Sequence, residues 1–255
     1  MLKFFRKIRQ RLLSENKFSK YLIYAIGEIV LVVIGILIAL QINNNNNYKA
    51  QRSVEQEYLL SLQTEFESNL NKINNSIQEN ERRIEAIDNL LTLFDKNVLD
   101  TINKQAISQM FFPVLGSALN YLPSKGVLSD IISSGKLNII LNTDLRQNLA
   151  SFESSIDLLN KQLNEAYFYD ESVRIFIFKE GSVRNITTDI RYMDFEHGSI
   201  SEKVNNKLMF ESVEFENYLL ALQMSARATN GPRLFRGIKA QIKTILKEIK
   251  QDLEK

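Results

Sequence analysis

One acidic residue, Glu28, lies inside a long apolar stretch, where an ionisable side chain could hold a proton, an ion or a polar partner. From Tyr21 to Ile42 the 22 residues include no other charged side chain. Because an acid in an apolar segment is costly, it indicates a functional contact. Three interpretations stay open. Glu28 is protonated, or hydrogen-bonded to a polar group, at a helix–helix contact, where Tyr24 one turn earlier could help; it shares an ion or proton site with a partner channel; or it extends toward Lys20 and the lipid headgroups.

The other polar residues give no support for an enzyme. The only histidine of the sequence, His197, lies in "FEHGS", a loop-like segment, and the absence of cysteine excludes thiolate ligands, disulfides and cysteine nucleophiles. The segment "SSGK" at 133–136 lacks the leading glycine and the spacing of a phosphate-binding loop. Acidic pairs such as Asp170–Glu171 and Asp194–Glu196 are interpreted as parts of solvated faces. We therefore expect no catalytic residue, no cofactor and no metal ligand.

Basic residues concentrate at the N-terminus. Residues 1–20 hold seven basic side chains and one acidic one, whereas the chain from Tyr48 onward has more acidic than basic residues. A nucleic-acid partner is not expected, because phosphate neutralisation needs a concentrated basic face. Apolar residues alternate with the basic ones at helical spacing, which predicts a basic amphipathic helix over 1–20 on an anionic membrane surface. An unstructured topology signal is the alternative. The membrane-surface residues are Lys3, Arg6, Lys7, Arg9 and Arg11.

The apolar stretch has the length of a membrane span. As a helix, residues 21–42 cover about 33 Å, the thickness of a bilayer core. A buried helix of a soluble protein and a cleaved signal peptide are the alternatives; the run exceeds the usual signal core of about 7–15 residues and has no small-x-small cleavage site. The preceding positive charges predict a cytoplasmic N-terminus and a periplasmic domain over 43–255 of a single-pass inner-membrane protein.

Glu28 shares one face of the predicted membrane helix with small residues. From Ala25 to Ile42 the positions on this face follow one another at intervals of 3, 4, 3, 4 and 3 residues, which is the spacing of a left-handed helix–helix seam. Gly35 and Ala39 form a small-xxx-small pair that lets another backbone approach. This face predicts contact with a second copy or with another membrane protein. The seam consists of Ala25, Glu28, Val32, Gly35 and Ala39, and the pattern continues to Ile42.

Helical periodicity dominates the rest of the chain. From Tyr48 the pattern predicts one amphipathic helix of about fifty residues, or two in line, with polar Asn80 at one stripe position. Such interruptions favour a helix packed in a bundle over a strict coiled coil. The stripe comprises Leu59, Leu62, Phe66, Leu70, Ile73, Ile77, Ile84, Ile87, Leu91, Phe94 and Val98.

Further helices alternate with two loose stretches, at 111–126 and 180–200. A short helix is predicted from Val127 to Ser134, ending at Gly135. Asn142 or Thr143 is expected to cap the next helix. Its stripe is Leu145, Leu149, Phe152, Ile156, Leu159 and Leu163.

The second half of that helix is ambiguous at residues 173–190. We favour helix, because the register continues through Tyr167 and Phe168; "SVRIFIF" followed by "KEGS" leaves a strand and turn as the alternative. Helices are expected over 201–228 and from 233 to the end, separated by "TNGPR". The last helix places Ile238, Ile242, Ile245, Ile249 and Leu253 on one face. The predicted fold is all-α: an amphipathic helix, one transmembrane helix and a bundle of long helices outside the membrane.

Two segments resemble a known family. The stretch "ENKFSKYLIYAIGEIVLVVIGILIALQINN", with its basic leader, and "SSGKLNIILNTDLRQNLASF" at 133–152 are similar to an uncharacterised Bacteroidota family of single-span membrane proteins carrying a domain of unknown function. The resemblance implies a membrane anchor and a helical remainder, and no activity. Asn45 stands where the family pattern has Trp, which weakens the outer interface anchor unless Tyr48 replaces it.

The sequence leads to one hypothesis and two rivals. The first is a membrane-anchored helical interaction or structural protein of the cell envelope without catalysis. The second is an ion-coupled accessory subunit of a transport or motor complex that uses Glu28. The third is a ligand sensor, which would need a separate cytoplasmic transmitter because about twenty residues cannot form a signalling domain.

Overall fold

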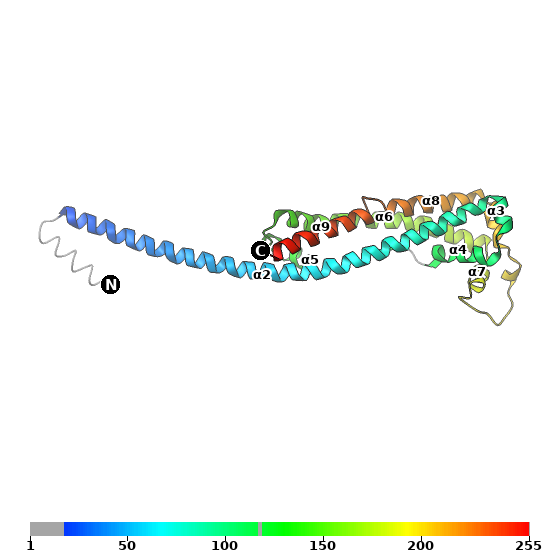
Figure 1. Cartoon of the computed structure of the whole chain (residues 1–255), viewed down its shortest axis with the longest axis horizontal. Coiled ribbons are helices and arrows are strands. Elements are labelled where there is room, and N and C mark those ends of the chain that lie inside the picture. Colours follow the sequence, from blue (N-terminus) through cyan, green and yellow to red (C-terminus); the bar gives the residue numbers. More distant parts are fainter. Residues whose placement is uncertain (1–17, 117–118, 255) are drawn as a thin grey trace. The chain divides into compact units, whose positions relative to one another are not determined.

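The computed structural model describes residues 18–116 and 119–254, and every regular element among them is a helix (Figure 1). The all-α prediction is confirmed. The chain divides into two compact units, Met1–Glu57 and Tyr58–Lys255. The α-helices are α2 (Phe18–Leu91), α3 (Lys96–Thr101), α4 (Lys104–Gly116), α5 (Gly126–Ser133), α6 (Thr143–Glu180), α7 (Val183–Asp189), α8 (Val213–Thr229) and α9 (Phe235–Leu253). Short 3-10 helices are η1 (Thr92–Phe94), η2 (Lys136–Ile139), η3 (Ile200–Lys203) and η4 (Asn206–Glu211).

Helix α2 joins the apolar stretch and the amphipathic stretch in one element of 74 residues. It runs through Asn43–Asn47 without a break, so the expected domain boundary at residues 42–43 falls inside a helix. The helix ends at Leu91, earlier than the stripe through Val98 predicts. The reason is local: the side chain of Asp95 accepts a hydrogen bond from the backbone N–H of Asn97 and starts α3 as a new helix.

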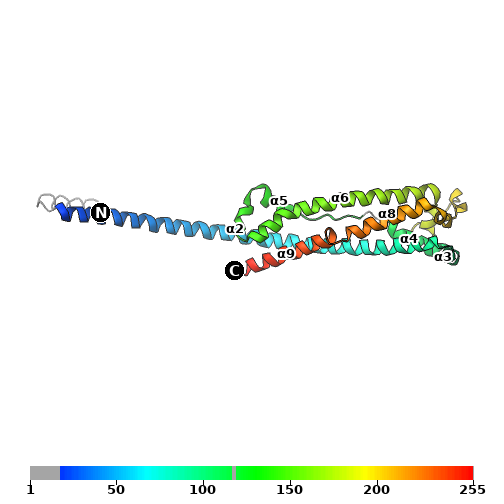
Figure 2. The same cartoon turned by 90° about the horizontal axis from the view of Figure 1, so that it is seen from above.

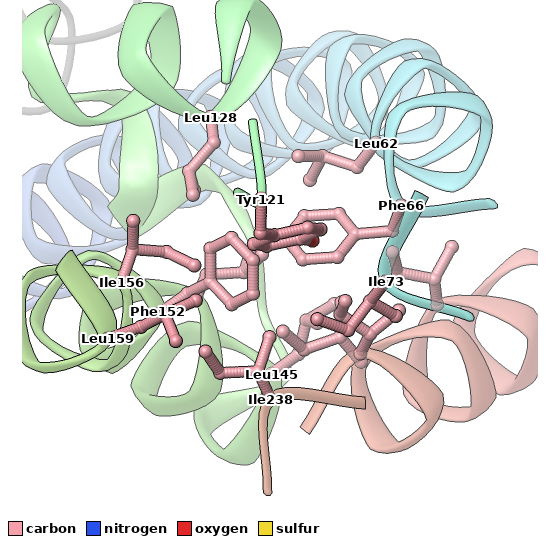
Figure 3. Packing of buried hydrophobic residues seen from close by; sticks show 14 of the residues in the cluster. Leu62, Phe66, Ile73, Tyr121, Leu128, Leu145, Phe152, Ile156, Leu159 and Ile238 are labelled. Carbon is pink, nitrogen blue, oxygen red and sulfur yellow. The ribbon is translucent and has the colours of Figure 1, made fainter. Parts of the chain in front are cut away.

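The second unit is a bundle built from three long helical rows. Figures 1 and 2 show α6, and α8 followed by α9, running alongside the Tyr58–Leu91 part of α2. One apolar cluster joins α2 with α5, the first half of α6 and α9, and includes Tyr121 (Figure 3). Within it the rings of Phe66 and Phe152 meet edge to face at 5.0 Å. A second cluster joins the end of α2 with α4, the second half of α6, and α8.

Polar side chains of α2 bind the backbone of the extended segment 119–125. Asn69, fully buried, donates from Nδ2 to the carbonyl of Ser124 at 2.8 Å and accepts from its N–H at 2.7 Å. Ser76 Oγ donates to the carbonyl of Asn120 at 2.9 Å. Tyr121 donates to the carbonyl of Asn69, and burial raises the pKa of the Tyr121 hydroxyl, which therefore keeps its proton. These bonds satisfy backbone groups that have no helix or sheet of their own.

Helix α5 also begins on a side chain of α2. The Glu65 carboxylate accepts from the backbone N–H groups of Val127 and Leu128, at 2.8 and 3.1 Å. It takes the place of an N-cap, because Lys125 at that position makes no capping hydrogen bond. The prediction of a short helix ending at Gly135 is confirmed within one residue, and Gly135 has the positive φ of 69° expected after a helix end.

Helix α6 confirms the predicted helix and corrects its register. Asn142 caps it by accepting from the backbone N–H groups of Asp144 and Leu145. The helix continues to Glu180, so the preference for helix over strand is confirmed through "SVRIFIF". The reason given for that preference, a register that continues through Tyr167 and Phe168, was wrong, since these side chains are 57% and 67% exposed. The buried register passes instead through Ala166, Asp170, Val173, Phe176 and Ile177.

Three expected boundaries are wrong, each for a physical reason. The first loose stretch contains the end of α4, which includes Pro113 because apolar Ile107, Phe111 and Val114 pack at helical spacing. The second contains α7, where the Ser182 side chain caps the helix. Helix α8 begins at Val213 rather than near 201, because 200–211 forms η3 and η4.

The break between α8 and α9 is stabilised from α2. Asn80, fully buried, donates from Nδ2 to the carbonyl of Ala226 at 2.8 Å and to Oδ1 of Asn230 at 2.9 Å. One of these acceptors is the Ala226 carbonyl in the last turn of α8, which also accepts from the backbone N–H of Asn230 at 3.2 Å. A Cβ at Gly231 would lie 2.8 Å from the carbonyl oxygen of Ala228, so this turn requires glycine.

Replacing Asn69 by Ala is expected to destabilise the bundle. Both hydrogen bonds to the backbone of Ser124 are lost and leave those groups without partners, which lowers the free energy of unfolding by about 2 kcal/mol. Urea unfolding of the full chain in detergent, followed by circular dichroism, measures the change. Gln63→Ala is the matched control on the same helix, since within the described residues the Gln63 side chain donates to Glu67 one turn away. Equal losses in the two variants would contradict the role of Asn69.

Candidate functional site

The predicted seam lies on the apolar part of α2. An 18-residue window of this helix has a mean hydropathy of 2.7 and is not buried in the structure; by length and composition it is the one described helix that could cross a membrane. Glu28 is half-buried, and Val32 is 54% exposed. A Cβ built at Gly35 meets no atom within 4 Å. The face around Gly35 and Ala39 therefore has room for another backbone, and contact there stays a prediction.

The predicted membrane-surface residues lie outside the described residues. This concerns the amphipathic segment over 1–17, including Lys3, Arg6, Lys7, Arg9 and Arg11. The chain is described from Phe18, where α2 begins. The prediction of a surface helix therefore stays untested.

The lone histidine lies in an exposed loop. Its backbone carbonyl accepts a hydrogen bond from Arg184, and its ring lies 6.3 Å from that of Phe195. The Arg184 guanidinium stacks 4.2 Å from the Phe195 ring centroid. In the part of the chain that the structure describes, no group of three or more His, Asp or Glu side chains could hold a metal ion.

A buried ion pair is the main polar feature that the sequence interpretation missed. The side chains of Arg83 on α2 and Asp170 on α6 are 4% and 5% exposed and form a direct hydrogen bond. Arg174 reaches the second Asp170 oxygen at 3.3 Å. Burial lowers the pKa of Arg83, and the charge of Asp170 opposes this shift.

A sequence signal for the pair existed. Arg83 stands three residues after Asn80 and four before Ile87, on the buried face of α2. Asp170 stands four residues after Ala166 and three before Val173, in the same relation to the core. A charged residue at a position of the buried stripe in each helix was the sequence signal for the ion pair. The interpretation of Asp170 as solvated was wrong.

The described residues form a cavity of about 200 Å³ between α4, α7 and residues 202–207. Its lining includes two lysines and two acids, Lys104, Lys207, Asp189 and Glu202. A more open groove of about 560 Å³ lies at the α8–α9 break, beside Leu158 of α6 and Pro232. Only the first combines opposite charges with a buried hydroxyl, that of Ser108. It is therefore the better candidate for binding a small polar molecule.

These features define an all-α protein with a helical bundle and one helix long and apolar enough to span a membrane. The chain belongs to a family of unknown function (DUF6090), which matches residues 28–219. The match begins at Glu28 and ends inside α8, so it includes most of the seam and both members of the buried ion pair. No curated protein and no solved structure matches the chain.

Replacing Arg83 by Met is expected to destabilise the bundle strongly. It leaves the buried Asp170 carboxylate with only its longer contact to the partly exposed Arg174, and the free energy of unfolding should fall by about 3 kcal/mol. Replacing both residues by apolar ones, Arg83→Met with Asp170→Leu, should recover most of the loss, because both fully buried charges are gone and Arg174, which loses its partner, is partly exposed. Chemical unfolding of the full chain in detergent measures both.

Arg236→Met is the control for the loss of an arginine. Its pair with Glu81 is 3.3 Å long, and the two side chains are 62% and 53% exposed. Solvent screens such a pair, so the loss should be much smaller. A double variant as unstable as Arg83→Met would contradict the assignment of the loss to an unpaired buried charge.

Proposed function

We propose that the protein is a single-pass bacterial inner-membrane protein that assembles through its membrane-spanning helix and has no catalytic activity. The observation that carries this proposal is the seam on α2, where Glu28, Gly35 and Ala39 share one face of an apolar helix. Small residues on one face of such a helix allow two backbones to approach and pack in a bilayer. The bundle formed by residues 58–255 is then presented outside the membrane.

The charge distribution supports a cytoplasmic N-terminus and a periplasmic C-terminal domain. Seven basic residues precede the apolar stretch, and only Lys49 and Arg52 follow it closely. Positive charge near a span is retained on the cytoplasmic side. The similarity of the leader and span to Bacteroidota membrane proteins supports a bacterial cell envelope.

The partner we propose is a second copy of the chain or another membrane protein. Nucleic acid is not proposed, because the chain from Tyr48 onward has no excess of positive charge. The leading role for Glu28 is a hydrogen bond across the helix contact, made by its carboxyl group. Such a bond adds to packing at Gly35 and Ala39 without any turnover of substrate.

Cross-linking in membranes tests the seam. The sequence has no cysteine, so single substitutions Gly35→Cys and Ala39→Cys report only on those positions. Under mild oxidation a second copy at the seam gives disulfide-linked dimers. A thiol-attached photo-cross-linker at the same positions captures any other membrane protein. We expect efficient cross-links at both positions, because they lie on one face of α2.

Leu37→Cys is the matched control for cross-linking. Position 37 lies on roughly the opposite face of the helix, since it is two positions along the helix from both 35 and 39. It should give several-fold less product than the seam positions. Equal yields at all three positions, or no cross-link to any protein, would remove the seam proposal.

An ion-coupled accessory subunit is the second candidate function, favoured by the single acid in the apolar stretch. Substituting Glu28 by Gln separates the two functions, because Gln keeps the shape and hydrogen bonding but does not titrate. If Glu28 only makes a contact, Glu28→Gln keeps the seam cross-links and Glu28→Leu weakens them several-fold. If Glu28 carries protons, the purified assembly in proteoliposomes shows proton flux that Glu28→Gln abolishes. We expect the first result, and flux that depends on Glu28 would contradict it.

A further inference from the structure

The walls of the cavity between α4, α7 and residues 202–207 are held by hydrogen bonds that leave little freedom. Asn185 on α7 donates from Nδ2 to the carbonyls of Ser201 and Val204, at 2.9 and 3.1 Å. Asn206 accepts from the N–H of Ser182 at 2.7 Å and donates to its carbonyl at 3.2 Å. These two amides join residues 201–206 to the N-terminal part of α7. The cavity is therefore preformed rather than assembled by a ligand.

Two of the charged groups are positioned by a hydrogen bond and keep further bonding capacity. Ser108, 2% exposed, donates from Oγ to Oδ2 of Asp189 at 2.7 Å. Lys207 donates from Nζ to the carbonyl of Leu99 at 2.6 Å. A carboxylate accepts several hydrogen bonds and an ammonium donates three. Asp189 Oδ1 and the remaining N–H groups of Lys207 can therefore meet a ligand.

Opposite charges line the cavity without neutralising one another. Lys104 and Lys207 supply two cations, and Asp189 and Glu202 supply two carboxylates. Within the described chain no ion pair of 4.0 Å or less joins these four side chains. Glu202 instead accepts from the backbone N–H of Ser199 at 2.9 Å. The charges lie close enough to line one cavity and too far apart to pair directly.

We propose that this cavity binds a small zwitterion, with its ammonium toward the carboxylates and its carboxylate toward the lysines. A ligand with one sign of charge would be attracted by one pair and repelled by the other. A divalent metal ion is disfavoured by the two ammonium groups for the same reason. The lining also includes apolar Ile107 and Val204, which suit a short aliphatic side chain.

The size of the cavity restricts the zwitterion to a few atoms. Drug-sized ligands occupy about 300–1,000 Å³. A volume of about 200 Å³ suits a free α-amino acid or a very short peptide that carries both termini. Both have the same two charged groups, so binding assays with each can distinguish them. This inference goes beyond the proposed function and does not depend on the seam in α2.

Calorimetric titration of the full chain in lipid nanodiscs tests the proposal. The probes are alanine, dialanine, N-acetylalanine and alanine methyl ester, of which the last two each lack one charge. We expect saturable binding of alanine and at least tenfold weaker binding of both modified forms, because each leaves one pair of side chains unmatched. If dialanine binds more tightly than alanine, the ligand is a peptide with both termini; if more weakly, it is the free amino acid.

Two substitutions locate the binding. Lys104→Met removes a cation, and Asp189→Asn removes a negative charge while keeping an oxygen that can accept from Ser108. Each should weaken alanine binding at least tenfold. Lys243→Met and Asp157→Asn, exposed on α9 and α6, are the matched controls and should bind as the unmodified chain does. Circular dichroism of all four variants verifies that the bundle is folded.

The proposal fails under any of three results. The first is the absence of saturable binding of alanine and dialanine up to about 10 mM, where affinity is too weak to be specific. The second is equal binding of alanine and its singly charged forms. The third is unchanged alanine binding in both folded cavity variants.

Discussion

Backbone groups in irregular segments must find hydrogen-bond partners, and in the bundle α2 supplies them from its side chains. Glu65, Asn69 and Ser76 bind backbone groups of residues 120–128, and Asn80 binds the end of α8. They share the buried face of α2 with apolar residues of the core, so this helix both packs in the core and binds backbone groups of other segments. The extended crossing at 119–125 and the break between α8 and α9 both depend on this arrangement.

The apolar core is divided along the bundle in a way that follows from these polar bonds. The first cluster surrounds the part of α2 up to Ile77, and the second begins at Ala86. Between them lie Asn80 and Arg83, each buried and each bonded to a different neighbouring helix. Because polar groups in a core require specific partners, this layer sets the alignment of α2 against α6 and α8 more narrowly than apolar contact would.

The periodicity of apolar residues made the long helices predictable. The features that it did not predict depend on contacts between residues far apart in the sequence. The apolar stripes of α6 and α9 and the Asn142 cap follow from residues close in sequence. The loose stretch expected at 111–126 missed the end of α4, because the burial of Phe111 and Val114 around Pro113 is a tertiary effect. The cavity was not predictable, since Ser108 and Asp189 are 81 residues apart and no local pattern joins them. The partners of Glu28 stay a prediction for the same reason: they belong to contacts that spacing alone does not specify.

The bundle uses its charges in two different ways, and the difference indicates where binding can occur. Arg83 and Asp170 are buried against each other, so their charges are already compensated and leave little capacity for a ligand. Asp189 and Lys207 are each held by one neutral group and are not paired with each other, although they line one cavity. Side chains that are already held in position lose little conformational entropy when a ligand of matching charge binds to them. The structural pair therefore stabilises the alignment of two helices, whereas the cavity keeps its charges available for recognition.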